Sequence, residues 1–152
     1  MTVTQRLSDL GIELPEVATP AGAYVPAVRS GSLVFTAGQV PFVGGKLAAA
    51  GKVGAEVDPG AAAGLARVCA LNALAAVHGL VGIDTVVRIV KVTGFVASAP
   101  GFGGQPAVVD GASALFGEIF GDAGKHARSA VGVAELPLNA PVEVEIVVEV
   151  AS

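Results

Sequence analysis

The stretch Arg128–Val150, RSAVGVAELPLNAPVEVEIVVEV, decides the fold, because it holds two β-strand patterns joined by a proline-rich connection. Successive side chains of a strand point to opposite faces of its sheet. In residues 142–150 the even-numbered positions are all apolar, whereas positions 143, 145 and 149 are glutamates. Together with the shorter alternation over residues 129–135, this pattern predicts a hairpin closed around residues 137–140.

The register of this hairpin gives Arg128 a neighbour. If residue 136 lies opposite residue 141, then Val131 lies opposite Ile146 and Arg128 opposite Glu149. One interpretation of Arg128 is therefore a cross-strand ion pair with Glu149, worth ~0–1 kcal/mol if it is exposed. The other is an anchor for a small anionic ligand, because a planar guanidinium binds a carboxylate bidentately and small residues lie beside it.

Toward the N-terminus the sequence predicts two helices and three further strands. The pair Asp58-Pro59 is a helix start, with the aspartate as N-cap and the proline at the first helical position, and Gly79 is expected to end that helix. The expected strands span residues 33–37, 46–53 and 85–96, and the expected helices span residues 59–78 and 106–120. This order predicts an α+β fold, in one domain of residues 1–152 whose first 20 residues form an extension.

The composition narrows the possible functions. Hydrophobic residues make up 53% of the 152 residues and charged residues 14%, and the net charge is −4. An acidic chain repels nucleic acid, so we expect no nucleic-acid partner. A small domain this poor in charge would expose large apolar patches if it stayed alone, so we expect a homo-oligomer.

Two features bear on where the chain works. The best candidate for a membrane span, residues 61–81, contains Arg67, Asn72 and His78 and is mostly alanine, so it falls short of the ~20 strongly apolar residues that a span needs. We expect a buried helix and no membrane partner. The single cysteine, Cys69, cannot form an intramolecular disulfide, and the N-terminus has no apolar signal core, so we expect a cytoplasmic protein.

Familiar metal and cofactor patterns are missing from the sequence. His78 and His126 are too few for a metal site, which usually needs three or four ligands. We expect His78 to cap a helix and His126 to be exposed. The glycines of residues 101–104 are not followed by Lys-Ser or Lys-Thr, so they predict an ordinary loop. Cys69 is expected to be a buried, inert thiol. We therefore expect neither a metal nor a cofactor.

Four segments together resemble the RidA (YjgF-like) imine deaminase family. They are GAYVPAV at residues 22–28, FTAGQVP at residues 35–41, the helical segment of residues 66–74, and the C-terminal block of residues 128–145. The C-terminal block is the specific part of this resemblance. The resemblance implies a chorismate-mutase-like mixed sheet with two helices packed on one face, and a homotrimer with ligand clefts between subunits.

The resemblance also implies an activity and the residues that carry it. Proteins of the RidA type hydrolyse reactive enamines and imines derived from amino acids to 2-keto acids and ammonia, without a cofactor. By position, Arg128 matches the arginine that binds the substrate carboxylate and Glu143 the glutamate that positions water. Tyr24 matches the tyrosine that walls the cleft, and Gly38 lies in the motif at the strand end.

Three residues depart from the family pattern at expected substrate contacts. Ala37 stands where the family usually has serine, Ala130 where the RidA type usually has cysteine, and Asp110 near an asparagine. A non-catalytic trimer that binds small carboxylates or keto acids is therefore the alternative function. The labels of translation inhibitor and ribonuclease, also used in this family, fit the acidic charge least.

The hairpin register separates the two catalytic candidates. Glu143 would lie opposite Ala134, six residues or roughly 20 Å from Arg128 at ~3.3 Å per residue. The two side chains of one chain could not then share a ligand. We therefore expect each cleft to take Arg128 from one subunit and Glu143 from its neighbour.

Overall fold

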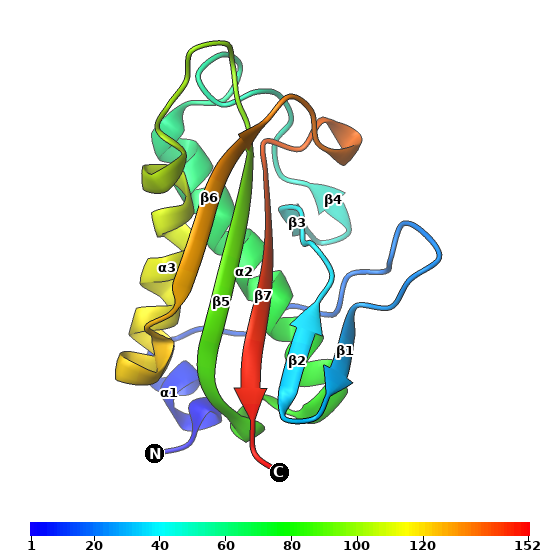
Figure 1. The fold of residues 1–152 in the computed structure, drawn as a ribbon, viewed down its shortest axis with the longest axis vertical. Helices are drawn as coiled ribbons and strands as arrows, with labels where there is room; N and C mark the ends of the chain where they lie inside the picture. The colour runs from blue at the N-terminus through cyan, green and yellow to red at the C-terminus, as the bar shows by residue number, and fades with distance from the viewer.

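The computed structural model describes all residues 1–152 and contains three α-helices and seven strands (Figure 1). The helices are α1 (Val3–Asp9), α2 (Pro59–Val81) and α3 (Gln105–Phe120). The strands are β1 (Ala27–Ser30), β2 (Leu33–Thr36), β3 (Phe42–Val43), β4 (Lys46–Leu47), β5 (Val86–Ala97), β6 (Ala127–Val133) and β7 (Val142–Val150). Five strands form one mixed sheet in the order β1-β2-β7-β5-β6, and β3 pairs only with β4.

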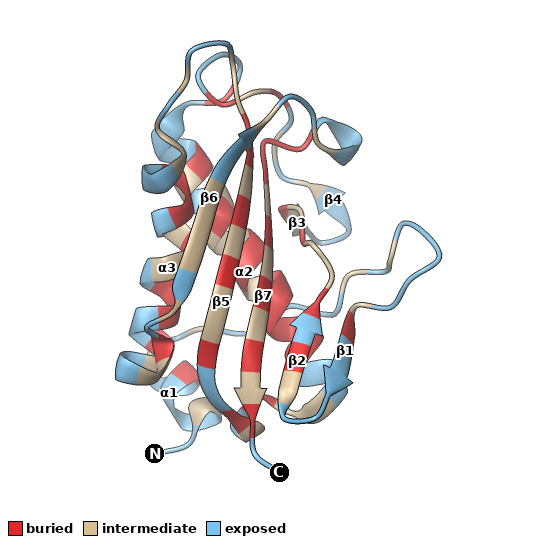
Figure 2. Ribbon diagram, viewed as in Figure 1, coloured by how far each residue is buried: buried red, intermediate tan, exposed pale blue.

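Two helices cover one face of this sheet, and the α+β prediction is confirmed. In Figure 1, α2 and α3 lie behind the strands, while the opposite face carries no helix. The buried residues of α2, α3 and the helix-facing side of β5 and β7 form one hydrophobic cluster. Figure 2 shows the resulting alternation along β7, where every second residue is buried. We call the uncovered side the open face.

The long helix α2 begins where its sequence predicts. The Asp58 carboxylate accepts hydrogen bonds from the N–H groups of Gly60 and Ala61, and Pro59 occupies the first turn. The helix continues past Gly79 and ends at Gly82, whose φ of 80° suits glycine. The prediction that Gly79 stops the helix after His78 was therefore wrong. As expected, His78 caps this end, because its Nδ1 accepts a hydrogen bond from the Ile83 N–H at 3.0 Å.

The same helix is the one segment of the chain that is long and apolar enough to cross a membrane. Ten of its 23 residues are buried within the fold. These buried positions include Cys69 and Asn72, and the Asn72 side-chain amide donates to the carbonyls of Val40 and Phe42. The core helix of a folded domain passes the same length and composition test, and 56% of the 18-residue apolar window of α2 is buried, as expected of a core helix.

The predicted hairpin between the last two strands was wrong. Strand β5 lies between them: it pairs parallel to β6, with Val92 beside Arg128, and antiparallel to β7, with Val92 beside Ile146. The segment β5-α3-β6 is therefore a crossover connection, which parallel strands require. Strands that follow one another in the sequence usually lie side by side in a sheet. Strands β6 and β7 do not, because β5 pairs with β6 along one edge and with β7 along the other.

The corrected pairing changes the faces of β6. Arg128 and Ala130 now share the helix-covered face with Val92, whereas Val131 points to the open face and is 43% exposed. The expected pair of Arg128 with Glu149 is also wrong, because Glu149 lies between Arg88 and Leu33 on the neighbouring strands.

The N-terminal half contains three elements that the sequence did not reveal, which are helix α1 and strands β1 and β3. Strand β1 pairs with β2 as a hairpin. The strand expected over residues 46–53 is present only as the two residues of β4. Helix α1 has only seven residues, too few to be stable alone, and tertiary contacts hold it. The Asp84 carboxylate accepts hydrogen bonds from the Thr4 N–H and hydroxyl, both at 2.8 Å.

Candidate functional site

A hollow of about 420 Å³ lies between the loop that precedes β1 and the start of β7. It brings together three of the expected site residues, Tyr24, Gly38 and Glu143, which come from the loop, the end of β2 and β7. We call this hollow the Glu143 pocket. Its remaining lining residues come from the same loop, from the segment after Gly38 and from the β6–β7 connection: Ala18, Thr19, Pro20, Ala21, Pro26, Gln39, Val40, Phe42, Pro137 and Leu138.

A bulge at the end of β2 shapes the floor of the pocket. The Ile146 N–H donates to the Thr36 hydroxyl oxygen at 3.0 Å instead of to a backbone carbonyl. Pairing with β7 resumes at Gln39, which exchanges two backbone hydrogen bonds with Val144. Between these points Ala37 and Gly38 leave the ladder, and the Ala37 N–H donates to the Pro26 carbonyl at 2.8 Å. Such a bulge redirects the residues beside it.

Gly38 is required by a close approach. A Cβ atom at this position would overlap the carboxylate of Glu143, with the nearest contact at Oε2. The glycine therefore opens the space in which the Glu143 side chain lies. Ala37, the neighbouring expected contact, is half-buried and takes part in the bulge but does not line the pocket.

The carboxylate of Glu143 is half-buried and has neither a hydrogen-bond partner nor an ion-pair partner in the chain. Burial raises the pKa of Glu143, and the nearby charge of Glu145 raises it further. A carboxyl group with a raised pKa is a better proton acceptor than an ordinary glutamate. The thiol of Cys69, by contrast, is an inert neighbour: burial raises its pKa well above the ordinary value, and the charge of Glu143 adds to this effect.

The rim of the pocket is formed by Tyr24 and Leu138. The Tyr24 hydroxyl accepts a hydrogen bond from the Ala21 N–H at 3.2 Å, and the ring packs over Gly22. Leu138 is 61% exposed and has a φ of 62°, a region that non-glycine residues other than asparagine seldom adopt. Sequence reasoning missed Leu138, because nothing in its residue type indicates a left-handed backbone.

Arg128 lies elsewhere, on the helix-covered face of β6, and α3 supplies its partners. Its Nη1 donates to the Asp110 carboxylate at 2.7 Å and to the Ser113 hydroxyl at 3.1 Å. Its Nη2 donates to the Pro106 carbonyl at 3.2 Å. The arginine side chain is 21% exposed and that of Asp110 is 68% exposed. The ion-pair partner of Arg128 is thus Asp110, and Ala130 lies two residues further along the same face.

A short relay of hydrogen bonds holds Ser113 in place. The His126 Nδ1 lies 2.6 Å from the Gly124 carbonyl, which can only accept, so Nδ1 carries the proton. Its Nε2 lies 2.8 Å from the Ser113 hydroxyl and, in the neutral imidazole, accepts the serine proton. The serine oxygen in turn accepts from Arg128. The expectation of an exposed His126 was wrong, since the ring is half-buried and packs edge-on against Phe116 at 5.9 Å.

The site residues thus divide into two groups on opposite faces of the sheet. Across the strands, Glu143 lies level with Phe95 and Val131, three residues from Arg128. The Cα atoms of Arg128 and Glu143 are therefore offset by three residues along the strand direction and by two strands across the sheet, which is a separation of roughly 14 Å. The expected separation of ~20 Å rested on the wrong hairpin. The chain also has no group of three or more His, Cys, Asp or Glu side chains placed to hold a metal ion.

Comparisons with known proteins agree with this architecture. A mixed sheet with its helices on one face defines the class as α+β with a chorismate-mutase-like fold. Residues 4–150 match the YjgF/chorismate mutase-like family of endoribonuclease candidates, and the chain belongs to this YjgF/RidA family. The resemblance inferred from the sequence is therefore confirmed.

Individual relatives cover nearly the whole chain. Protein TCP17 of Trypanosoma cruzi is 43% identical over 151 residues, which is 97% of this chain and 93% of that protein. An endoribonuclease candidate from Shewanella oneidensis is 34% identical, covers 99% of this chain and all (100%) of the other, and superimposes with a TM-score of 0.94. Escherichia coli TdcF, crystallised with bound serine, is 27% identical, with coverage of 90% and 94% and a TM-score of 0.66.

Proposed function

We propose that this protein hydrolyses reactive enamines and imines derived from amino acids, releasing 2-keto acids and ammonia without a cofactor. The observation that carries the proposal is the Glu143 carboxylate, which is half-buried beside Gly38 in a pocket and has no partner in the chain. An unpaired carboxylate is costly to bury, so its retention in a pocket favours a chemical role over a structural one.

The reaction needs an anchor, a water molecule and a proton acceptor. Arg128 binds the substrate carboxylate, and an enamine first tautomerises to the imine. Glu143 takes a proton from water as the water oxygen bonds to the C=N carbon. The resulting tetrahedral intermediate receives that proton on nitrogen. Glu143 then carries the proton of the new hydroxyl group to the same nitrogen, so that the C–N bond breaks and ammonia leaves as the carbonyl forms. Arg128 contributes orientation, because it fixes the C=N carbon near the water.

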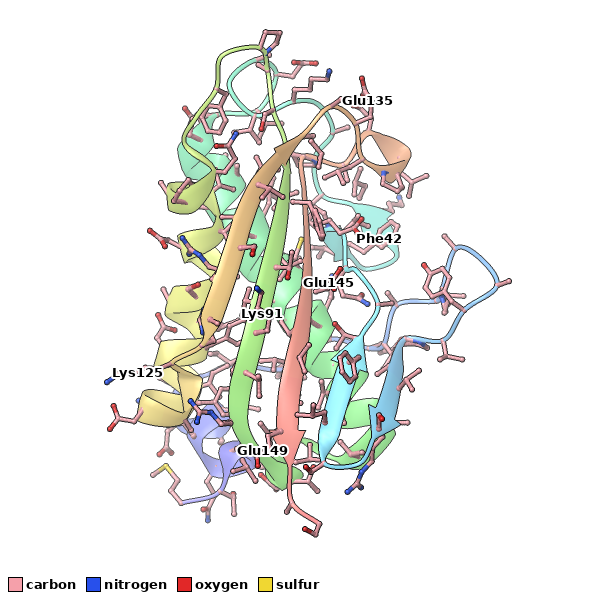
Figure 3. The ribbon with its side chains drawn as sticks, viewed as in Figure 1. Phe42, Lys91, Lys125, Glu135, Glu145 and Glu149 are labelled. Atoms are coloured by element: carbon pink, nitrogen blue, oxygen red, sulfur yellow. The ribbon has the colours of Figure 1, made fainter.

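The two groups can meet only if each site is built from two subunits, since Arg128 and Glu143 of one chain lie on opposite faces of the sheet. We propose a homotrimer with its clefts between subunits. The open face supports this assembly, because it exposes Phe35 and Val131, which are 44% and 43% exposed. Figure 3 labels Lys91 and Glu145 at the centre of the same face, where the Lys91 ammonium donates to the Ser129 hydroxyl at 3.2 Å.

The relatives support a small ligand with an amino acid skeleton. TdcF binds serine, which carries the carboxylate and the nitrogen of the substrates proposed here. The net charge of −4 argues against RNA as the substrate, although endoribonuclease candidates occur in the family. We place the reaction in the cytosol, where the free thiol of Cys69 is stable.

A non-catalytic trimer that binds small carboxylates is the second candidate function. It is favoured by the ion pair between Arg128 and Asp110, which partly compensates the charge of the anchor. Ala37 and Ala130 also offer a ligand no side-chain hydrogen bond, because alanine has no polar side-chain atom.

Hydrolysis of 2-aminoacrylate, followed by ammonia release, separates these candidates. The deaminase accelerates it, and Glu143→Gln lowers kcat by 10²–10⁴-fold, the usual contribution of a general base. Glu149→Gln, on the same face of β7, is the matched control and retains full activity. Carboxylate binding without any acceleration of hydrolysis would establish the binding module instead. Unchanged activity in Arg128→Ala would remove the anchor from the mechanism.

A further inference from the structure

We propose that Asp110 and Arg128 form a two-charge clamp for a zwitterion, in which Arg128 takes the carboxylate of the ligand and Asp110 takes its cationic nitrogen. The inference rests on the proposed function and names its substrate form: the protonated iminium acid, or an amino acid of the same shape. We call the two residues the clamp.

The arginine keeps donors free for a ligand. A guanidinium has five N–H groups. In Arg128, both Nη1 hydrogens are used by Asp110 and Ser113, and one Nη2 hydrogen is used by Pro106. The Nε–H and the second Nη2 hydrogen have no acceptor in the chain. Nε and Nη2 share one edge of the guanidinium plane, so a ligand carboxylate can bind there while the bond to Asp110 stays intact.

The aspartate also keeps an acceptor free. Only Oδ1 of Asp110 bonds to Arg128, and no donor in the chain reaches Oδ2. An ionised carboxylate offers about four lone-pair sites, so one bond to Arg128 leaves most of that capacity unused. The side chain is 68% exposed, so that oxygen is open to a ligand. A free acceptor and two free donors therefore lie within one residue pair.

The charges of the clamp favour a zwitterion over an anion. A ligand that carries only a carboxylate meets Arg128 with its charge partly compensated, and it also faces the negative charge of Asp110 at short range. In an α-iminium acid the cationic nitrogen sits on the carbon next to the carboxylate, so both charges of the ligand find an opposite charge. This complementarity gives specificity by repelling the wrong ligand as well as by attracting the right one.

The clamp also predicts the order of binding and release. Hydrolysis replaces the cationic nitrogen by a neutral carbonyl oxygen, which can only accept hydrogen bonds. The 2-keto acid product thus loses the contact with Asp110 and presents an oxygen to a carboxylate. The site binds its product less tightly than its substrate, which favours product release.

The binding of alanine and pyruvate by the full-length protein tests the clamp, because the two differ only at the α-carbon, which carries an ammonium group and a hydrogen in alanine and a carbonyl oxygen in pyruvate. The clamp predicts that Asp110→Asn weakens alanine binding by about tenfold and tightens pyruvate binding, measured by titration calorimetry. The substitution keeps an oxygen for Arg128. Glu118→Gln is the matched control, because Glu118 lies on the same helix as Asp110. The substitution removes an exposed ion pair with Arg67 of α2, and both affinities should stay unchanged.

Other outcomes overturn the clamp. If Asp110→Asn binds both alanine and pyruvate more tightly, Asp110 competes with ligands for Arg128. If it binds both more weakly, Asp110 only holds the arginine in place. If neither affinity changes, Asp110 does not contact ligands. Failure of the wild-type protein to prefer alanine over pyruvate also overturns it. The binding data need no turnover, so a protein that shows the predicted selectivity but no hydrolysis retains the clamp and loses the deaminase.

Discussion

Arg128 and Glu143 of one chain occupy opposite faces of the same sheet, with β5 between their strands. The arginine lies on the helix-covered face against α3, and the glutamate lies in a pocket beside the bulge of β2. Because neither side chain can reach across the sheet, a reaction that uses both must take place between subunits.

Gly38→Ala should disable the glutamate without unfolding the protein. The new Cβ would overlap the Glu143 carboxylate, so the side chain must leave its place in the pocket. We expect kcat for 2-aminoacrylate to fall by about 10²-fold or more, as for loss of a general base.

Gly64→Ala, on an open stretch of α2 where a Cβ meets nothing within 4 Å, is the control. It should leave kcat unchanged and stabilise the helix by roughly 0.5–1 kcal/mol. Full activity in Gly38→Ala would show that the position of Glu143 is not needed.

The raised pKa of Glu143 predicts a pH dependence of stability. Because the folded protein binds the proton more tightly than the unfolded chain, this group lowers the free energy of unfolding as pH rises from the ordinary glutamate pKa of about 4.3 through the raised value. Glu143→Gln removes this loss, so the variant should gain Tm relative to the wild type at pH 7 but not at pH 4. An equal difference in Tm at both pH values would contradict the raised pKa.

Thr36→Val should destabilise the fold by about 1–3 kcal/mol, because it leaves the Ile146 N–H buried without an acceptor. The measurement is urea denaturation. Thr93→Val is the matched control, since the Thr93 hydroxyl makes no hydrogen bond in the chain and its side chain is half-buried. Equal losses in both variants would mean that the bulge does not depend on the threonine hydroxyl.

Ser113→Ala should loosen the anchor without touching the chemistry. The serine oxygen accepts from Arg128 and its proton goes to His126, so the alanine removes one of three supports of the guanidinium. We expect KM to rise several-fold with kcat unchanged, and Ser113→Thr to restore KM.

Ser129→Ala is the control for this prediction. Ser129 neighbours Arg128 in sequence, but its hydroxyl faces Lys91 on the other side of the sheet. An unchanged KM in Ser113→Ala, or the same rise in Ser129→Ala, would show that the relay does not position the arginine.

The sequence predicted the helices and strands better than it predicted which strands lie side by side in the sheet. The alternation of residues 142–150 identified β7 and its buried face, and Asp58-Pro59 identified the start of α2. The same alternation could not say which strand lies beside β6, because a period of two is satisfied by any neighbour. The order of strand, helix and strand over residues 86–133 does carry that information, since such a unit usually forms a parallel crossover.

The site shows the same limit. Gly38 and Glu143 were predicted, but their contact depends on a bulge that replaces one backbone acceptor by the Thr36 hydroxyl. Ser113 and His126 are 13 residues apart, and only the packing of β6 against α3 joins them. The positive φ of Leu138 has no sequence signal, because leucine seldom adopts it.

Mixed trimers test the central claim most directly, that each active site takes Arg128 from one subunit and Glu143 from its neighbour. The Arg128→Ala and Glu143→Gln proteins, each of which is expected to retain little activity alone, are co-refolded in equal amounts. Random assembly then gives sites that combine an intact Arg128 with an intact Glu143 from another chain, and about a quarter of wild-type deaminase activity should return. Activity in the mixture no greater than that of the two separate variants would contradict the account.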